Sequence, residues 1–204
     1  MYPIAGRQCA TIAAVISAIG AVSGCSPHGP RGDRPVAAAA TSPSVGLVLQ
    51  ESEGERRTRR PRTGAQPAAL TSPVIIKVDG TNGGSSQLFM GYEDIPPGQG
   101  IVRHYHPHAD EIVFVHRGHG VATLGDRQAE VAAGTTIYIP HNTRISLRNT
   151  GPEPVTIAFI FADPAMSSWF RDGTVPEGEP APTLTAADTE ARRARHREHI
   201  VHEP

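Results

Sequence analysis

Cysteine is scarce in this 204-residue chain, which contains only Cys9 and Cys25. Both lie in the first 25 residues, so the rest of the chain can form no disulfide and no thiolate metal site. A metal bound there must be held by nitrogen and oxygen ligands. The chain also has no excess of basic residues, because it contains 19 Lys and Arg and 20 Asp and Glu. This balance argues against nucleic acid as a partner.

Long hydrophobic runs are missing as well. The apolar run from Cys9 to Val22 falls short of the roughly 20 residues that a bilayer span needs. It follows the basic Arg7 and precedes small residues, a pattern typical of an export signal. We therefore predict that residues 1–24 are a signal peptide and that the mature protein is exported.

The end of this signal, "VSGC" at residues 22–25, resembles the lipobox of bacterial lipoproteins. That resemblance implies that Cys25 is lipidated and that the lipid anchor attaches the chain to a membrane as a cell-envelope lipoprotein. In a host with two membranes, the location would be the outer membrane or periplasm. The alternative is an ordinary signal peptide with an incidental cysteine.

Composition divides the remaining chain into three parts. Residues 25–72 are rich in Pro, Gly, Ala, Ser and Arg, which predicts a disordered linker that acts as a tether. Residues 73–163 contain short β-branched and apolar runs separated by turn formers, which predicts an all-β sandwich or barrel. Residues 164–204 form a C-terminal extension, with short helices predicted at "PAMSSWF" and after the cap-like Thr185.

Histidine is concentrated in one stretch, "GQGIVRHYHPHADEIVFVHRGHG" at residues 98–120. On a strand, His104 and His106 point to the same side, and Glu111 opens the next strand after a short loop. Two histidines and one carboxylate suit Fe(II), with Mn, Ni, Co and Zn also compatible. A hydrogen-bonded cluster without metal is the alternative for the same three side chains.

The same stretch resembles the first motif of the cupins. Its fixed positions are met by Gly98, His104, His106, Glu111 and Gly118. The resemblance implies the double-stranded β-helix, or jelly-roll barrel, with the site inside the barrel. It also implies a small-molecule ligand or substrate in the barrel and a homodimer.

The second cupin motif is met only in part, at Gly134, Pro140 and Asn149. Asn142 replaces a glycine, a mild change because Asn tolerates the left-handed backbone conformation. Ile145 replaces a histidine that resemblance identifies as the fourth metal ligand. Three protein ligands with open positions still make a competent metal site.

Other side chains are weaker candidates for the site. His141 and His108 are candidates for a fourth ligand or for the cavity wall, while Tyr138, Arg144 and Arg103 are candidates for substrate contact. Their directions depend on strand register.

Two functions stay open at this point. One is a metal-dependent enzyme, and the other is a small-molecule-binding or structural cupin without metal. The C-terminal histidines, His196, His199 and His202, are expected at the surface.

Overall fold

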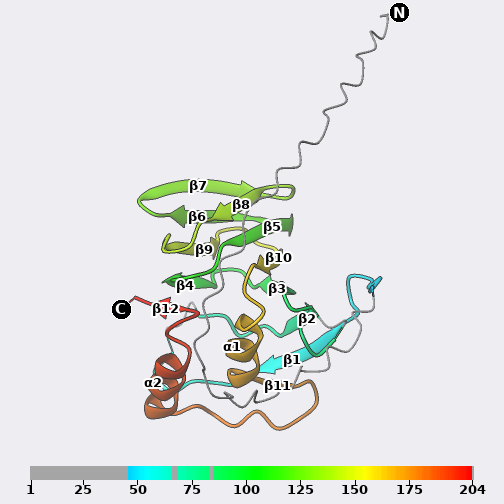
Figure 1. The fold of residues 1–204 in the computed structure, drawn as a ribbon. Coiled ribbons are helices and arrows are strands. Elements are labelled where there is room, and N and C mark those ends of the chain that lie inside the picture. Colours follow the sequence, from blue (N-terminus) through cyan, green and yellow to red (C-terminus); the bar gives the residue numbers. More distant parts are fainter. Residues whose placement is uncertain (1–45, 66–68, 83–84, 204) are drawn as a thin grey trace, which may run out of the picture. The chain divides into compact units, whose positions relative to one another are not determined.

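The computed structural model describes residues 46–65, 69–82 and 85–203. The predicted signal peptide, Cys25 and the first part of the predicted linker lie outside these residues. The described chain forms two antiparallel sheets, drawn in Figure 1, which confirms the all-β prediction.

The larger sheet has the order β11-β1-β2-β3-β10-β5-β8. Its strands are β1 (Glu55–Arg59), β2 (Val74–Val78), β3 (Phe89–Ile95), β5 (Glu111–Arg117), β8 (Thr136–Ile139), β10 (Val155–Phe161) and β11 (Thr174–Pro176). The second sheet has the order β12-β4-β9-β6-β7. Its strands are β4 (Gly100–Tyr105), β6 (His119–Leu124), β7 (Arg127–Ala132), β9 (Ile145–Asn149) and β12 (Val201–His202).

The core lies between the two sheets because alternate residues of their strands point inward. In β5, Val113 and Val115 are buried while Ile112 and Phe114 are exposed. Ile145 and Leu147 of β9 join the same core from the facing sheet. Glu111 shares the inward face of β5, so this alternation carries one carboxylate into the interior.

Two turn positions of the motifs need a left-handed backbone conformation. Gly118 has φ 82°, and a Cβ there would lie 2.5 Å from the carbonyl oxygen of Pro154, so only glycine fits. Asn142 has φ 59°, which confirms that Asn takes the left-handed place of the motif glycine.

The linker predicted over residues 25–72 is wrong where β1 forms. β1 pairs with both β2 and β11, so it is an integral strand of the larger sheet. Its sequence, ERRTR, does not predict a strand, because the side chains that point inward are polar. Arg57 is buried and donates from Nε to Thr174 Oγ1 over 2.7 Å. A hydrophobic alternation is therefore missing from a genuine strand.

The C-terminal extension contains the predicted helices, α1 (Met166–Asp172) and α2 (Ala186–Arg195). Thr185 caps α2 through a capping box with Asp188, as the sequence predicted. Met166 and Trp169 of α1 pack into the core. Figure 1 shows both helices near the end of the sheets where β11 and β1 lie.

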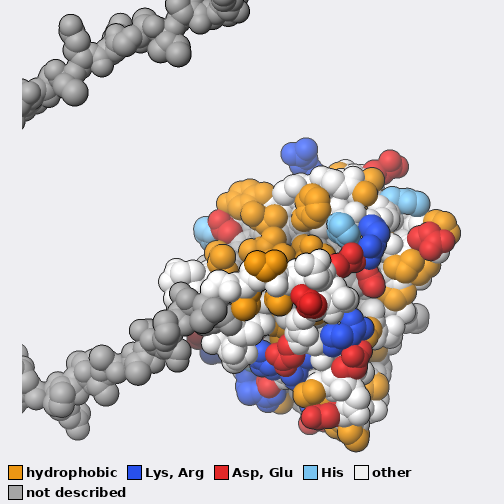
Figure 2. Space-filling view, turned by 90° about the vertical axis from the view of Figure 1, so that its right-hand side faces the viewer, with side chains coloured by type: hydrophobic (Ala, Val, Ile, Leu, Met, Phe, Trp, Pro, Cys, Tyr) orange, Lys and Arg blue, Asp and Glu red, His pale blue; other side chains and the backbone are white. Residues whose placement is uncertain are grey.

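The outer surface has an uneven distribution of apolar side chains. Figure 2 shows hydrophobic groups gathered in the upper half of one face, while acidic and basic groups intermix below them. In the part of the chain that the structure describes, no helix has the length and apolar character to cross a membrane.

Candidate metal centre

The strands bring together three side chains that can each act as a metal ligand. His104 is near the end of β4, His106 follows the strand, and Glu111 opens β5. Their side chains offer one ligand atom each, and these atoms all lie within 4.8 Å of one another. The three residues are only 6%, 1% and 6% exposed. The convergence predicted from the i, i+2 spacing and the following strand is present.

Backbone carbonyls orient both imidazole rings. His104 Nδ1 lies 2.8 Å from the carbonyl oxygen of Val102, and His106 Nδ1 lies 2.7 Å from that of His199. A carbonyl oxygen only accepts, so both Nδ1 atoms carry the proton and donate it. In the neutral rings, both Nε2 atoms then present lone pairs, which is the tautomer that a metal-binding histidine needs.

The two lone pairs face each other and the carboxylate. The Nε2 atoms lie 3.2 Å apart, and His106 Nε2 lies 3.4 Å from Glu111 Oε2. Oε2 is buried and has no hydrogen-bond donor among the described residues. Burial, followed by the neighbouring His106, lowers the pKa of His104, so its ring stays neutral. Three acceptors without a shared donor fit a bound cation, and the N₂O set suits a divalent transition metal.

The position of the missing histidine is directly beside this cluster. Ile145 is the cross-strand partner of His104 in the β4–β9 ladder and is 3% exposed. Its aliphatic side chain offers no ligand atom. The protein thus supplies three ligands, which leaves coordination positions for water or a small molecule.

The structure places neither His141 nor His108 in the cluster. His141 is bound through its backbone N–H and Nδ1 to Asp110, each over 3.0 Å, on the exterior. Tyr138 donates to the same carboxylate over 2.8 Å and is 55% exposed. These contacts, first the backbone N–H, lower the pKa of Asp110 to about 2. His108 is exposed. The fourth-ligand and substrate-contact predictions for these residues therefore find no support.

Arg103 and Arg144 hold the C-terminal segment rather than the cavity. Arg103 Nε donates to Glu203 Oε2 over 3.0 Å, and Arg144 Nε donates to Oε1 of the same side chain. These hydrogen bonds, with Arg144 contributing most, lower the pKa of Glu203. Neither arginine lines the cavity beside His104, so their predicted role in substrate contact is not supported by their positions.

The expectation that the C-terminal histidines are at the surface is wrong for His196, and His199 and His202 are half-buried. His196 is buried and bonds Asp172 over 2.8 Å, and the His199 backbone orients His106. In β12, His202 pairs with His104, and the two rings stack 5.7 Å apart. Burial, then His104, lowers the pKa of His202 to about 3. A two-residue strand is too short to give a readable sequence pattern.

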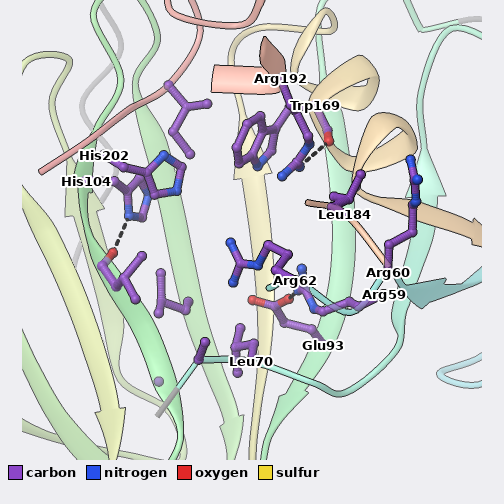
Figure 3. Close-up of a pocket in the computed structure, with 16 residues that line it drawn as sticks. Arg59, Arg60, Arg62, Leu70, Glu93, His104, Trp169, Leu184, Arg192 and His202 are labelled. Atoms are coloured by element: carbon purple, nitrogen blue, oxygen red, sulfur yellow. Dashed lines mark hydrogen bonds and ion pairs between the residues drawn. The ribbon is translucent and has the colours of Figure 1, made fainter. Parts of the chain in front are cut away.

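His104 also forms part of the wall of a cavity of about 120 Å³ (Figure 3). The cavity is bordered by β1 and the segment after it, by β3, β4 and β12, and by both helices. Its lining contains Arg59, Arg60, Arg62, Arg192, Glu93, His104, His202, Trp169, Leu70, Ile101, Leu184 and Ile200. Most of the charged residues of this wall lie outside the histidine motif, so the motif does not predict them.

Comparison with known proteins bears on the β-sheet region. Residues 91–161 match the family model described as a cupin domain. Protein SchB of Streptomyces halstedii is 33% identical over 98 residues, which cover 48% of this chain and 66% of SchB, just under two thirds of it. Polyketide synthase CurC of Streptomyces cyaneus is 28% identical over 144 residues, 71% of this chain and 78% of CurC.

Among solved structures, a Klebsiella pneumoniae protein with a double-stranded β-helix domain matches with 21% identity and a TM-score of 0.40. The match covers 45% of this chain and 76% of that protein. The region that matches the cupin domain model includes His104, His106, Glu111 and Ile145.

Proposed function

Because this chain contains a cupin domain and so belongs to the cupin superfamily, we propose that His104, His106 and Glu111 bind a divalent metal ion beside a small-molecule cavity. The observation that carries the proposal is the meeting of three buried acceptors, two Nε2 atoms and Oε2, that lack a donor among the described residues. Burying such groups without a cation is costly.

Contacts within the chain fix the geometry of this site without a metal. The carbonyl groups of Val102 and His199 fix the tautomer and direction of the rings. The core side chains around the cluster exclude water, which strengthens its electrostatic interactions. When bound, the metal would supply Lewis-acid polarisation of an oxygen atom of the small molecule. One relative, CurC, carries the name of a polyketide synthase, which supports an organic small molecule as the ligand.

A cupin that binds a small molecule, or serves a structural role, without metal is the second candidate. Ile145 favours it, because an aliphatic side chain stands where resemblance implies a fourth ligand. The two candidates differ in one measurable property, the metal content of the purified chain.

Elemental mass spectrometry on the full chain, purified without chelators or a histidine tag, tests the proposal. We expect about one metal ion per chain in the parent and none in a His104→Ala, His106→Ala double variant. His108→Ala is the matched control, since this exposed histidine lies outside the cluster and its loss should leave the metal content unchanged. If the parent stays metal-free after loading with Fe(II), Mn(II), Ni(II), Co(II) and Zn(II), the metal-free candidate replaces the proposal.

We further propose that the chain is an exported lipoprotein of the cell envelope, anchored through Cys25. The support is the sequence of residues 1–25, which lie outside the described residues. Membrane fractionation of the expressed chain and mass analysis of its N-terminus test this. A Cys25→Ser variant should leave the membrane fraction, and a mature parent chain without acylation at Cys25 would contradict the proposal.

A further inference from the structure

The cavity beside His104 has an excess of positive charge. Four of its lining residues are arginines, and Glu93 is the one acidic residue among the described residues of its wall. Arg59 forms an ion pair with Glu93, which neutralises both. Arg60 donates to the carbonyl oxygen of Pro182 over 3.1 Å and points away from the cavity in Figure 3. The remaining positive charge of the cavity wall is carried by Arg62 and Arg192.

Arg192 is a buried cation with no carboxylate partner among the described residues. It is 7% exposed, and its guanidinium lies 3.2 Å from the ring centroid of Trp169. Nη2 donates to the Trp169 carbonyl oxygen over 2.6 Å, whereas Nε has no hydrogen-bond partner among the described residues. The nearby Asp172 pairs instead with Arg195 and His196. A buried guanidinium that keeps its charge needs a compensating anion.

Arg62 extends the same positive region. Between residues 46 and 203, the described part of the chain supplies neither an ion pair nor a hydrogen bond to its side chain. Burial, followed by Arg59 and Arg193, lowers the pKa of Arg62, as expected where like charges face one another. In Figure 3 its guanidinium points toward the side formed by His104 and His202.

Apart from His104 and His202, the rest of the wall is apolar. Leu70, Ile101, Leu184 and Ile200 line the cavity together with the face of Trp169. Inorganic phosphate would leave these side chains without a partner. A molecule with an anionic head and a short hydrocarbon body satisfies both halves of the wall, and guanidinium groups match a planar carboxylate well.

We propose that Arg62 and Arg192 bind the carboxylate of a small organic acid, whose hydrocarbon part packs against the apolar wall next to His104. The inference deepens the proposed function and rests on it for the ligand's place beside a metal. The carboxylate contacts themselves need no metal. Both arginines lie outside residues 91–161, so the cupin region contributes the metal ligands and the flanking segments select the ligand.

Calorimetric titration of the full chain with butyrate, 1-butanol and inorganic phosphate tests the proposal. Butyrate should bind at least about tenfold more tightly than butanol, because charged hydrogen bonds contribute strongly in a buried site. Arg62→Gln should weaken butyrate binding about tenfold or more, and Arg62→Lys should restore only part of it. Arg60→Gln is the matched control and should bind butyrate like the parent. Circular dichroism confirms that each variant is folded.

The same titration on the His104→Ala, His106→Ala variant separates this inference from the metal proposal. Butyrate binding that persists there and is lost in Arg62→Gln supports the carboxylate site, even if the parent contains no metal. A parent that binds metal but binds butyrate no better than butanol overturns the carboxylate site alone. Equal butyrate affinity in Arg62→Gln and Arg60→Gln, or tighter binding of phosphate than of butyrate, also overturns it.

Discussion

Removing the last six residues should weaken metal binding, although none of them is a proposed ligand. The deletion of residues 199–204 takes away the carbonyl oxygen of His199, which accepts the proton of His106 Nδ1 over 2.7 Å. It also removes β12, the edge strand beside the strand that carries His104. Loss of a group that orients a metal ligand typically costs about 10–100-fold in affinity, and we expect a reduction of that size.

Stability should fall in the same variant. Ile200 is 6% exposed and belongs to the core, and truncation of such a side chain costs about 2–5 kcal/mol. A chain that ends after His202 is the matched control, because it keeps His199, Ile200 and β12. It loses the contacts of Glu203 with Arg103 and Arg144, which solvent screens, so this loss should change stability little.

The assay is competition between the chain and a chromophoric chelator for Mn(II) or Zn(II), below the unfolding temperature of the shorter variant. Urea unfolding of both truncated chains measures the loss of stability separately. If the deletion of 199–204 lowers stability but leaves metal affinity equal to that of the control, the His199 carbonyl does not orient His106. The tautomer of His106 would then be set by another contact.

Three further changes have defined outcomes. The pKa of buried His104 is lowered and that of half-buried His202 is lowered to about 3, so each takes up its proton at a lower pH in the folded chain than in the unfolded chain, where the pKa is about 6.5. The free energy of unfolding of the metal-free chain should therefore decrease as pH falls below about 6.5, by up to about 1.4 kcal/mol per pH unit for each histidine. Urea unfolding at pH 7, 6 and 5 measures this decrease. The His202→Asn variant should show a smaller dependence of unfolding free energy on pH. Ile145→His should tighten metal binding by placing a third imidazole, as a fourth protein ligand, opposite His104, while it costs the metal-free chain about 1–3 kcal/mol; unchanged metal affinity in the chelator assay would show that position 145 does not face the metal. Thr185→Ala should cost about 1 kcal/mol in urea unfolding by removing the cap of α2, and Thr185→Ser should recover most of it; equal losses in both variants would contradict the capping role.

The parts of the fold that could be predicted are those that local chemistry determines. The i, i+2 spacing of His104 and His106 fixes a common side. Glu111 begins the next strand, which belongs to the facing sheet, so its approach to the two histidines follows from the barrel that the cupin resemblance implied. Asn142 takes the left-handed conformation because the turn requires it. The cap at Thr185 depends only on its neighbours three residues away.

The parts that could not be predicted depend on contacts between distant segments. Nothing within "HIVHEP" indicates that His202 stacks on His104, because β12 exists only through its pairing with β4, about 100 residues earlier. β1 falls within the predicted linker because its buried position, Arg57, carries a charged side chain. Arg57 is satisfied by Thr174 and Arg59 by Glu93, and both partners are known only from the folded chain.

β1 and β12, the two strands that the sequence does not predict, both line this cavity, which explains why their sequences lack the apolar pattern of a core strand. In β1 the charge of Arg57 is compensated by Glu55 and that of Arg59 by Glu93. Arg62, just after β1, and Arg192, in α2, line the same cavity without a carboxylate partner among the described residues, so their charge lowers the stability of the ligand-free chain. An anionic ligand removes that cost on binding, and the free energy so recovered contributes to its affinity.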